Sequence, residues 1–311
     1  MNPTLISRTT LMCGALLLGF WSADLQAAKG SFHETYAVAE PFMLDVTTGS
    51  GKIDIRAGSV GEITIIGKIK VGKGWFGRSA GKAEDIVQEL EASPPVEISD
   101  GLVRVGYIKE KRLSRNVSIS YEIVVPATTE VKSHTGSGSQ SISGVRGPVE
   151  VGSGSGRLTL KDIDGPVEAR AGSGSIRADG VAGAFEAHTG SGEIRLMQVA
   201  PGDVKATAGS GSIELHGIVG SIRARSGSGR IDVEGQQTGP WDLDTGSGSV
   251  HVALPADAAF TLDAESNSGG IVVDHPVTIQ GRVSKKHLRG EVRGGGEMLR
   301  IESGSGQIRV E

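Results

Sequence analysis

A tryptophan and two aspartates in the second half of the chain could contact a sugar. Trp241, Asp242 and Asp244 lie within the stretch PWDLDTG. An aromatic ring beside carboxylates often holds carbohydrate, and two carboxylates about 5–10 Å apart suit glycoside hydrolysis. Residues i and i+2 of any strand satisfy that separation, however, and the alternating pattern makes Trp241 a core residue. The triplet is a candidate glycan contact, and the sequence predicts no catalytic residue.

A basic cluster near the carboxyl end is the second candidate. It consists of Arg282, Lys285, Lys286, Arg289 and Arg293. Clustered cations attract anionic lipid headgroups, lipopolysaccharide or acidic polysaccharide. A solvated surface loop is the simpler interpretation, and contact with an anionic partner is the functional one.

The spacing of other residues excludes several common sites. Each Gly-Ser-Gly precedes a strand and recurs many times, whereas a dinucleotide-binding fingerprint opens a helix. The histidines are scattered without zinc spacing, and most repeats lack the aspartate of a calcium-binding β-roll. The net charge of −4 is unlike that of nucleic-acid-binding proteins. The sequence therefore predicts no cofactor, no metal and no nucleic-acid partner.

The elements that must position these residues are short repeats. Successive alternating segments begin with an apolar residue at Val149, Leu158, Val167, Ile176 and Phe185, nine residues apart, and the series continues to Ile271 with rare insertions. Two short strands and two turns then make one coil of a β-solenoid, in which each coil contacts only its neighbours. A flat antiparallel meander is the alternative, but open sheets of more than about ten strands curl or split. The sequence predicts an all-β solenoid of roughly seven or more coils.

The Gly-Ser-Gly motif is interpreted as the corner of each coil. Glycine reaches φ > 0 without steric cost, and serine can hydrogen-bond the backbone of a turn. Small side chains also let neighbouring turns pack closely. The motif therefore indicates architecture and not chemistry.

Composition divides the chain into four segments. Residues 1–27 are typical of a secretory signal peptide, with Arg8 before an apolar run and Ala27 at the cut; an uncleaved anchor is the alternative. Residues 28–132 predict a β-rich cap with a helix at 81–92 and a hairpin at Asp100-Gly101. Residues 133–275 predict the solenoid, and residues 276–311 an excursion followed by closing strands. Cys13 lies in the signal segment, so the mature chain has no disulfide.

Several stretches together resemble a bacterial family known as putative adhesins. They are TGSGKIDI near the start, YEIVVPATTEVKSHTGSG from Tyr121, the serial Gly-Ser-Gly units, and GGGEMLRIESGSGQIRV at the end. The resemblance implies an exported domain of unknown function built from Gly-Ser-Gly β-strand repeats. It implies no catalytic residue.

These observations predict a non-enzymatic, exported, adhesin-like scaffold or binding module. It would act in the periplasm or at the cell surface and present repetitive β faces to an envelope protein or polysaccharide. No segment after the signal is apolar enough to cross a membrane. The alternatives are a carbohydrate-active β-helix enzyme or glycan-binding protein, and a sensor of envelope stress acting through a partner.

Overall fold

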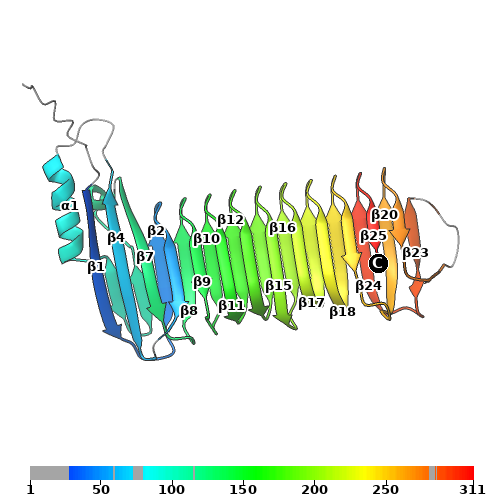
Figure 1. Cartoon of the computed structure of the whole chain (residues 1–311), viewed down its shortest axis with the longest axis horizontal. Helices are drawn as coiled ribbons and strands as arrows, with labels where there is room; N and C mark the ends of the chain where they lie inside the picture. Colours follow the sequence, from blue (N-terminus) through cyan, green and yellow to red (C-terminus); the bar gives the residue numbers. More distant parts are fainter. Residues whose placement is uncertain (1–27, 59, 73–79, 115, 280–283, 285) are drawn as a thin grey trace, which may run out of the picture.

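The strands stack into one long, narrow solenoid. The computed structural model describes residues 28–58, 60–72, 80–114, 116–279, 284 and 286–311. Within them, 25 strands form one continuous hydrogen-bonded sheet that wraps around a thin core. Helix α1 (Ala80–Ala92) lies at the amino-terminal end of the stack (Figure 1), and the single turn α2 (Lys111–Ser114) lies nearby. The predicted all-β solenoid is confirmed, whereas the predicted signal peptide, 1–27, falls outside the described residues.

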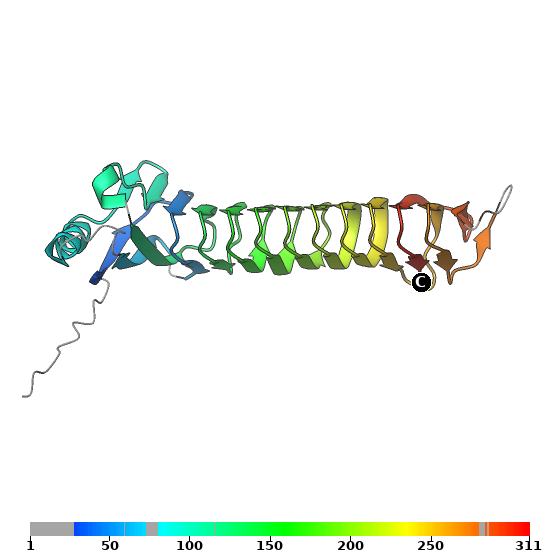
Figure 2. The ribbon, with the colours of Figure 1, turned by 90° about the horizontal axis from the view of Figure 1, so that it is seen from above.

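The wrapped sheet has two faces, which Figure 2 shows as two rows of strands joined by turns. In spatial order, face 1 contains β5 (Val96–Ser99), β6 (Leu102–Val105), β2 (Met43–Thr48), β8 (Glu130–Thr135), β10 (Val149–Ser153), β12 (Val167–Ala171), β14 (Phe185–Thr189), β16 (Val204–Ala208), the second halves of β17 (Ile213–Ser226) and β18 (Ile231–Thr245), β24 (Glu297–Ser303), β20 (Phe260–Ser266), β23 (His287–Val292) and β22 (Val277–Thr278).

Face 2 contains, in spatial order, β1 (Ala28–Ala37), β4 (Glu62–Val71), β7 (Val117–Val125), β3 (Ile53–Ala57), β9 (Gln140–Ser143), β11 (Leu158–Asp164), β13 (Ile176–Ala182), β15 (Ile194–Ala200), the first halves of β17 and β18, β19 (Val250–Ala253), β25 (Ile308–Val310) and β21 (Ile271–Val273). Through the regular part of the stack, like strands pair in parallel with like, one coil apart.

The nine-residue series forms the core. Val167, Ile176 and Phe185 are 3%, 1% and 1% exposed. Because side chains alternate across a strand, the residue that follows each of them points to solvent. Val167 lies in register with Phe185 on the next coil, so each coil buries its apolar residues against the equivalent residues of its neighbours. This nearest-neighbour burial stabilises a solenoid.

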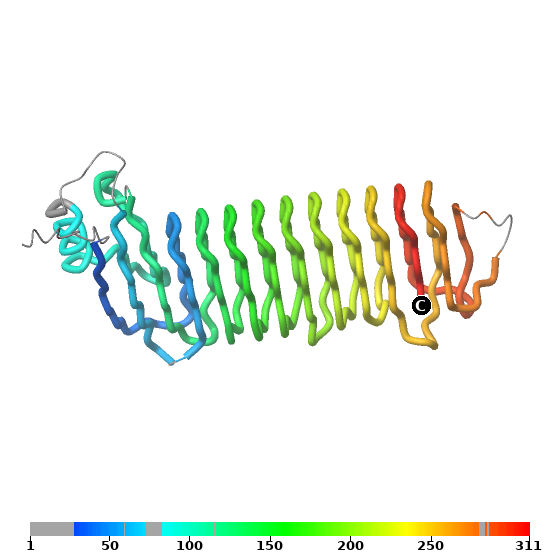
Figure 3. The backbone as a smooth tube through the Cα atoms, turned by 45° about the horizontal axis from the view of Figure 1, so that its top comes forward, coloured from blue at the N-terminus to red at the C-terminus, as the bar shows by residue number. Residues whose placement is uncertain are grey.

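The spatial order of the coils departs from chain order at both ends. At the amino-terminal end, the coil β2–β3 lies between β6–β7 and β8–β9, although β6 and β7 follow it in sequence. At the other end, the last coil in sequence, β24–β25, lies between β18–β19 and β20–β21. The carboxyl terminus therefore lies within the stack and not at its end (Figure 3). The antiparallel strand β23 covers β20 instead.

Crowding, and not a left-handed backbone, explains the glycines of the Gly-Ser-Gly corners. None of them has a φ between +20° and +160°. A Cβ on Gly174 would lie 1.9 Å from the carbonyl oxygen of Gly156 on the preceding coil, and one on Gly211 would lie 1.7 Å from that of Gly192. Positive φ occurs at the opposite, looser turns, as at Gly180. The prediction that the Gly-Ser-Gly corners pack closely is correct. Glycine with positive φ occurs instead at the looser turns on the other edge of the solenoid.

A buried hydroxyl ties most corners to the coil before. Thr189 accepts a hydrogen bond from Gly192 N at 3.1 Å and donates one to the carbonyl of Gly174 at 2.9 Å. At the Gly227–Gly229 corner, Ser226 likewise accepts a hydrogen bond from Gly229 N and donates one to the carbonyl of Gly211. The bonding residue is thus the Ser or Thr before the first glycine, whereas the sequence pointed to the serine between the glycines.

Candidate functional site

Outward side chains on face 1 form a row of charges that runs across the strands. We call it the charge row. Neighbouring members lie in register on adjacent strands, about 4.8 Å apart. In spatial order the row is Arg104, Asp45, Lys132, Glu150, Glu168, Glu186, Lys205, Arg223, Asp242, Arg300, Asp263 and Arg289.

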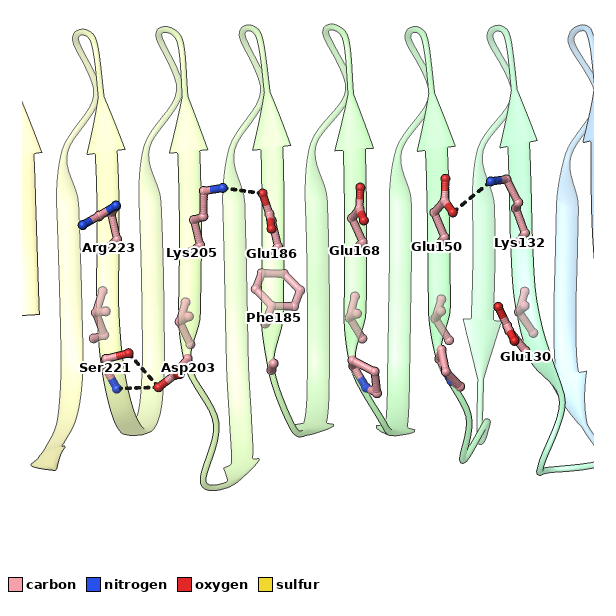
Figure 4. A pocket seen from close by; sticks show the side chains of 18 of the residues that line it. Glu130, Lys132, Glu150, Glu168, Phe185, Glu186, Asp203, Lys205, Ser221 and Arg223 are labelled. Atoms are coloured by element: carbon pink, nitrogen blue, oxygen red, sulfur yellow. Dashed lines mark hydrogen bonds and ion pairs between the residues drawn. The ribbon is translucent and has the colours of Figure 1, made fainter. Parts of the chain in front are cut away.

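A groove follows the middle of the charge row. It has a volume of about 650 Å³ and extends from β8 to β18. One wall is the charge row from Lys132 to Asp242, and the other is the residue that precedes the first buried position of each strand. These preceding residues include Pro148, Pro166 and Ala184. Figure 4 shows the side chains of the groove arranged along successive coils.

A second hollow adjoins the groove on the side of the Gly-Ser-Gly corners. It has a volume of about 530 Å³ and shares Lys132 and Glu150 with the groove. Its floor is Gly152, which holds a position where the neighbouring coils carry His134 and Arg170. A Cβ at Gly152 would lie 2.8 Å from His134 Nδ1, so the imidazole of His134 lies over Gly152 in the space that a side chain would take.

Ion pairs hold the three successive glutamates of the charge row. Lys132 Nζ lies 3.0 Å from Glu150, and Lys205 Nζ lies 2.7 Å from Glu186. The guanidinium of Arg170 pairs with the middle glutamate, Glu168. Each carboxylate thus has a cation beside it, so the acidic run has no uncompensated charge.

Hydrogen bonds from neighbours shift two groove carboxyls in the same direction. The bond from Lys205 lowers the pKa of Glu186 below its usual value, because it stabilises the carboxylate. The hydroxyl and backbone N–H of Ser221 donate to Asp203 Oδ1 at 2.6 and 3.1 Å and lower the pKa of Asp203. Both groups are therefore held as anions near neutral pH.

In the predicted glycan triplet, Trp241 is buried, whereas Asp242 and Asp244 point outward. Trp241 is 0% exposed, and its Nε1 donates to the carbonyl of Gly220 at 2.9 Å. Its buried ring offers no surface to a sugar, so this part of the prediction is corrected. Asp242 lines the end of the groove, 3.6 Å from Arg223 and from Arg225. Asp244 points outward on the same strand, nearer the Gly-Ser-Gly corner.

The predicted basic cluster lies at the carboxyl-terminal cap, away from the groove. Arg282 and Lys285 are outside the described residues. Lys286 and Arg289 are exposed, and Arg289 lies in register with Asp263. Arg293 is also exposed and donates to the carbonyl of Ala256 at 2.9 Å. Contact between the basic cluster and an anionic partner stays a prediction.

The sequence pointed to neither the groove nor the hollow at Gly152. A signal was present in the aligned stretches VEVGSGSG, VEARAGSG and FEAHTGSG, where Gly152, Arg170 and His188 hold the same position. The depth of the surface depends on how neighbouring coils stack, which no single repeat encodes.

Two further observations concern metal ligands and membrane-spanning helices. Among the described residues, no three or more His, Cys, Asp and Glu side chains are grouped so that they could hold a metal ion. Neither described helix is both long and apolar enough to cross a membrane.

The comparisons with known proteins decide the family. The Toastrack DUF4097 family matches residues 44–311, from the second residue of β2 to the carboxyl terminus. The chain belongs to this family. The Toastrack match confirms the resemblance found in the sequence, and it names a domain of unknown function.

Several solved structures are similar to this Toastrack chain. A putative cell adhesion protein from Clostridium sporogenes ATCC 15579 is 15% identical, with 90% of this chain and 99% of that chain covered and a TM-score of 0.21. A putative adhesin from Bacteroides fragilis NCTC 9343 is 14% identical, with coverage of 92% and 100% and a TM-score of 0.40. A putative lipid binding protein from Parabacteroides distasonis ATCC 8503 is 16% identical, with coverage of 90% and 97% and a TM-score of 0.48. No curated protein matches the sequence.

Proposed function

We propose that this protein is a non-enzymatic binding module exported to the cell envelope, and that the groove on face 1 is its binding surface. The observation that carries the proposal is the pair of adjoining hollows on this face. Their volumes lie within the range of about 300–1,000 Å³ that is common for ligand sites.

The rigidity of the groove supports binding. Its side chains stand on strands that are paired on both sides, which holds the backbone beneath them in place. A surface held in place before the ligand arrives loses less conformational entropy when it binds.

Glu186 and Asp203 of the groove do not have the pKa shift that a glycosidase acid needs. A glycosidase needs one carboxyl with a raised pKa, which donates a proton to the leaving group. The pKa values of Glu186 and Asp203 are shifted in the opposite direction. Export to the envelope is supported by the signal-like residues 1–27.

Co-sedimentation with isolated bacterial envelopes tests the proposal. Ala184→Trp places an indole in the groove, because Ala184 is exposed and lines it. Thr159→Trp is the matched control, since Thr159 points outward from β11 on face 2. We expect the wild type and Thr159→Trp to sediment with envelopes and Ala184→Trp to stay in solution.

Thermal melting of all three proteins establishes that they are folded. Equal sedimentation of Ala184→Trp and Thr159→Trp would place the binding surface elsewhere on the molecule. Failure of the folded wild type to sediment would contradict the binding function itself.

A further inference from the structure

We propose that the binding surface on face 1 takes face 1 of a second copy of this chain, with the two solenoids antiparallel. The two-fold axis lies in the interface, parallel to the strands, and passes Glu186 of β14. This inference rests on the proposed function and names the partner of its binding surface.

The charge row is complementary to its own reverse. Glu97 of β5 lies in register with Arg104 and extends the row by one strand. When the extended row is turned end to end about Glu186, each charged residue on one side of the axis meets a residue of opposite sign on the second copy. The six opposed pairs are Glu97 with Arg289, Arg104 with Asp263, Asp45 with Arg300, Lys132 with Asp242, Glu150 with Arg223, and Glu168 with Lys205. Two such rows form an isologous interface, in which the same patch serves both copies.

The match specifies one register. A displacement by one strand opposes Lys132 to Arg300 in one direction and Lys132 to Arg223 in the other. Most of the other opposed pairs also become pairs of like charge. Because like charges in contact across an interface are strongly unfavourable, the row favours the alignment about Glu186 over both of its neighbours.

Ion pairs within one chain fit the alignment. The Lys132–Glu150 pair, at 3.0 Å, faces the Arg223–Asp242 pair, at 3.6 Å, in the reverse order. Four charges of alternating sign then lie at the corners of a square, and each gains a second partner of opposite sign. All four side chains are partly exposed, so they can reach the second copy without leaving their partners in the first.

The residues at the axis allow the two faces to approach. Glu186 meets its own copy there, and Lys205 lies 2.7 Å from it in each chain, so a cation accompanies each carboxylate. Ala184 precedes β14 and also meets its own copy, with no side chain beyond Cβ. Sheets packed face to face lie about 10 Å apart, which two opposed side chains such as lysine and glutamate can span.

The neighbouring row on the side of the Gly-Ser-Gly corners adds no repulsion. The same alignment opposes its charged and histidine side chains to groups that are neutral or of opposite sign. These are Arg170 with Thr207, Arg225 with Gly152, Glu302 with Thr47, and His134 with Asp244.

The size of the face suits a stable dimer. From β5 to β23 the row crosses strands about 4.8 Å apart over roughly 58 Å, and strands of five residues are about 16 Å long. The footprint is therefore about 900 Å² on each copy, close to the roughly 800 Å² per partner of a standard interface.

Sedimentation velocity of charge-reversal variants tests the inference. Lys132→Glu and Asp242→Lys each oppose like charges at two symmetric places in the dimer. Within one chain these residues are six strands apart, about 29 Å, so their charges can meet only between copies. Arg177→Glu is the matched control, because Arg177 belongs to face 2.

We expect the wild type to form a dimer that weakens as salt is added. Lys132→Glu and Asp242→Lys should each dimerise at least tenfold more weakly. An equimolar mixture of these two variants should recover the dimer, because both places then hold opposite charges. Arg177→Glu should dimerise like the wild type, and thermal melting establishes that every variant is folded.

Three results would overturn the inference. They are wild type that stays monomeric at about 100 μM, equal dimerisation of Lys132→Glu and Arg177→Glu, and a mixture of the two folded face 1 variants that stays monomeric.

Envelope co-sedimentation separates this inference from the proposed function. If the wild type is monomeric and Ala184→Trp still loses envelope binding, the partner is a different envelope component and the binding face is right. If the wild type dimerises through face 1 and does not sediment with envelopes that carry this chain, the dimer stands and the envelope function fails.

Discussion

Alanine in place of the second glycine of one Gly-Ser-Gly corner should destabilise the stack more than most surface substitutions. In Gly174→Ala the new Cβ would lie 1.9 Å from the carbonyl oxygen of Gly156, and ordinary contact begins at 3.4 Å. The two coils must therefore separate locally by about 1.5 Å, or the corner must rotate. Either movement breaks the bonds from Gly172 N to Ser153 O and from Ser173 N to Gly154 O, both 2.9 Å long.

The expected cost follows from these contacts. Overpacking costs about 1–3 kcal/mol, and each lost hydrogen bond about 0.5–1.5 kcal/mol. Gly174→Ala should therefore lower the free energy of unfolding by roughly 2–6 kcal/mol. Gly49→Ala is the control, because a Cβ at Gly49 meets nothing within 4 Å and its φ is ordinary. That variant should be neutral or stabilised by up to about 1 kcal/mol.

Urea unfolding and amide hydrogen exchange measure the effect. Exchange is needed because a repeat protein can open one coil at a time, and a single unfolding midpoint then understates local loss. The amides of Gly172 and Ser173 should lose protection in Gly174→Ala while distant coils keep theirs. Equal stability and equal protection in the two alanine variants would refute the view that close approach of coils, and not backbone conformation, requires glycine here.

The remaining predictions concern the corners, the charge row and the core. Ala171→Ser should raise the free energy of unfolding by about 0.5–1.5 kcal/mol, because it supplies the corner hydroxyl that Ala171 lacks; urea unfolding with no gain would contradict the role of that hydroxyl. Lys205→Met should raise the pKa of Glu186 toward its usual value, which NMR titration of the Glu186 carboxyl measures. A lowered carboxyl pKa stabilises the fold at pH values above the unfolded pKa, and this stabilisation is lost as the pH falls through the folded pKa. The variant should therefore lose less stability than the wild type on acidification. Trp241→Phe should destabilise the fold by about 1–3 kcal/mol, because it leaves the Gly220 carbonyl without its donor. Envelope binding at 20 °C should be unchanged. Loss of binding by the folded variant would show that Trp241 contributes to the binding site.

Local pattern predicted much of the architecture but little of the site. The helix at 81–92 and the hairpin at Asp100-Gly101 have counterparts in α1 and in the antiparallel pair β5–β6, because spacing and turn residues act within a few positions. For the same reason the alternation of Trp241 already marked it as a core residue. The groove could not be predicted in this way, because Lys132 and Glu186 are far apart in sequence and lie in the same row only when the coils stack.

The sequence by itself determined the coil: its length, its inward residues and its small corners, all of which follow from alternation and from a nine-residue period. Only the tertiary structure decided which coils are neighbours at the two ends, where β2–β3 and β24–β25 lie between coils that are distant in sequence. The physical reason is that every coil offers a similar apolar edge and a similar set of backbone donors and acceptors. The period therefore cannot specify the order of stacking, and long-range packing of the caps selects it.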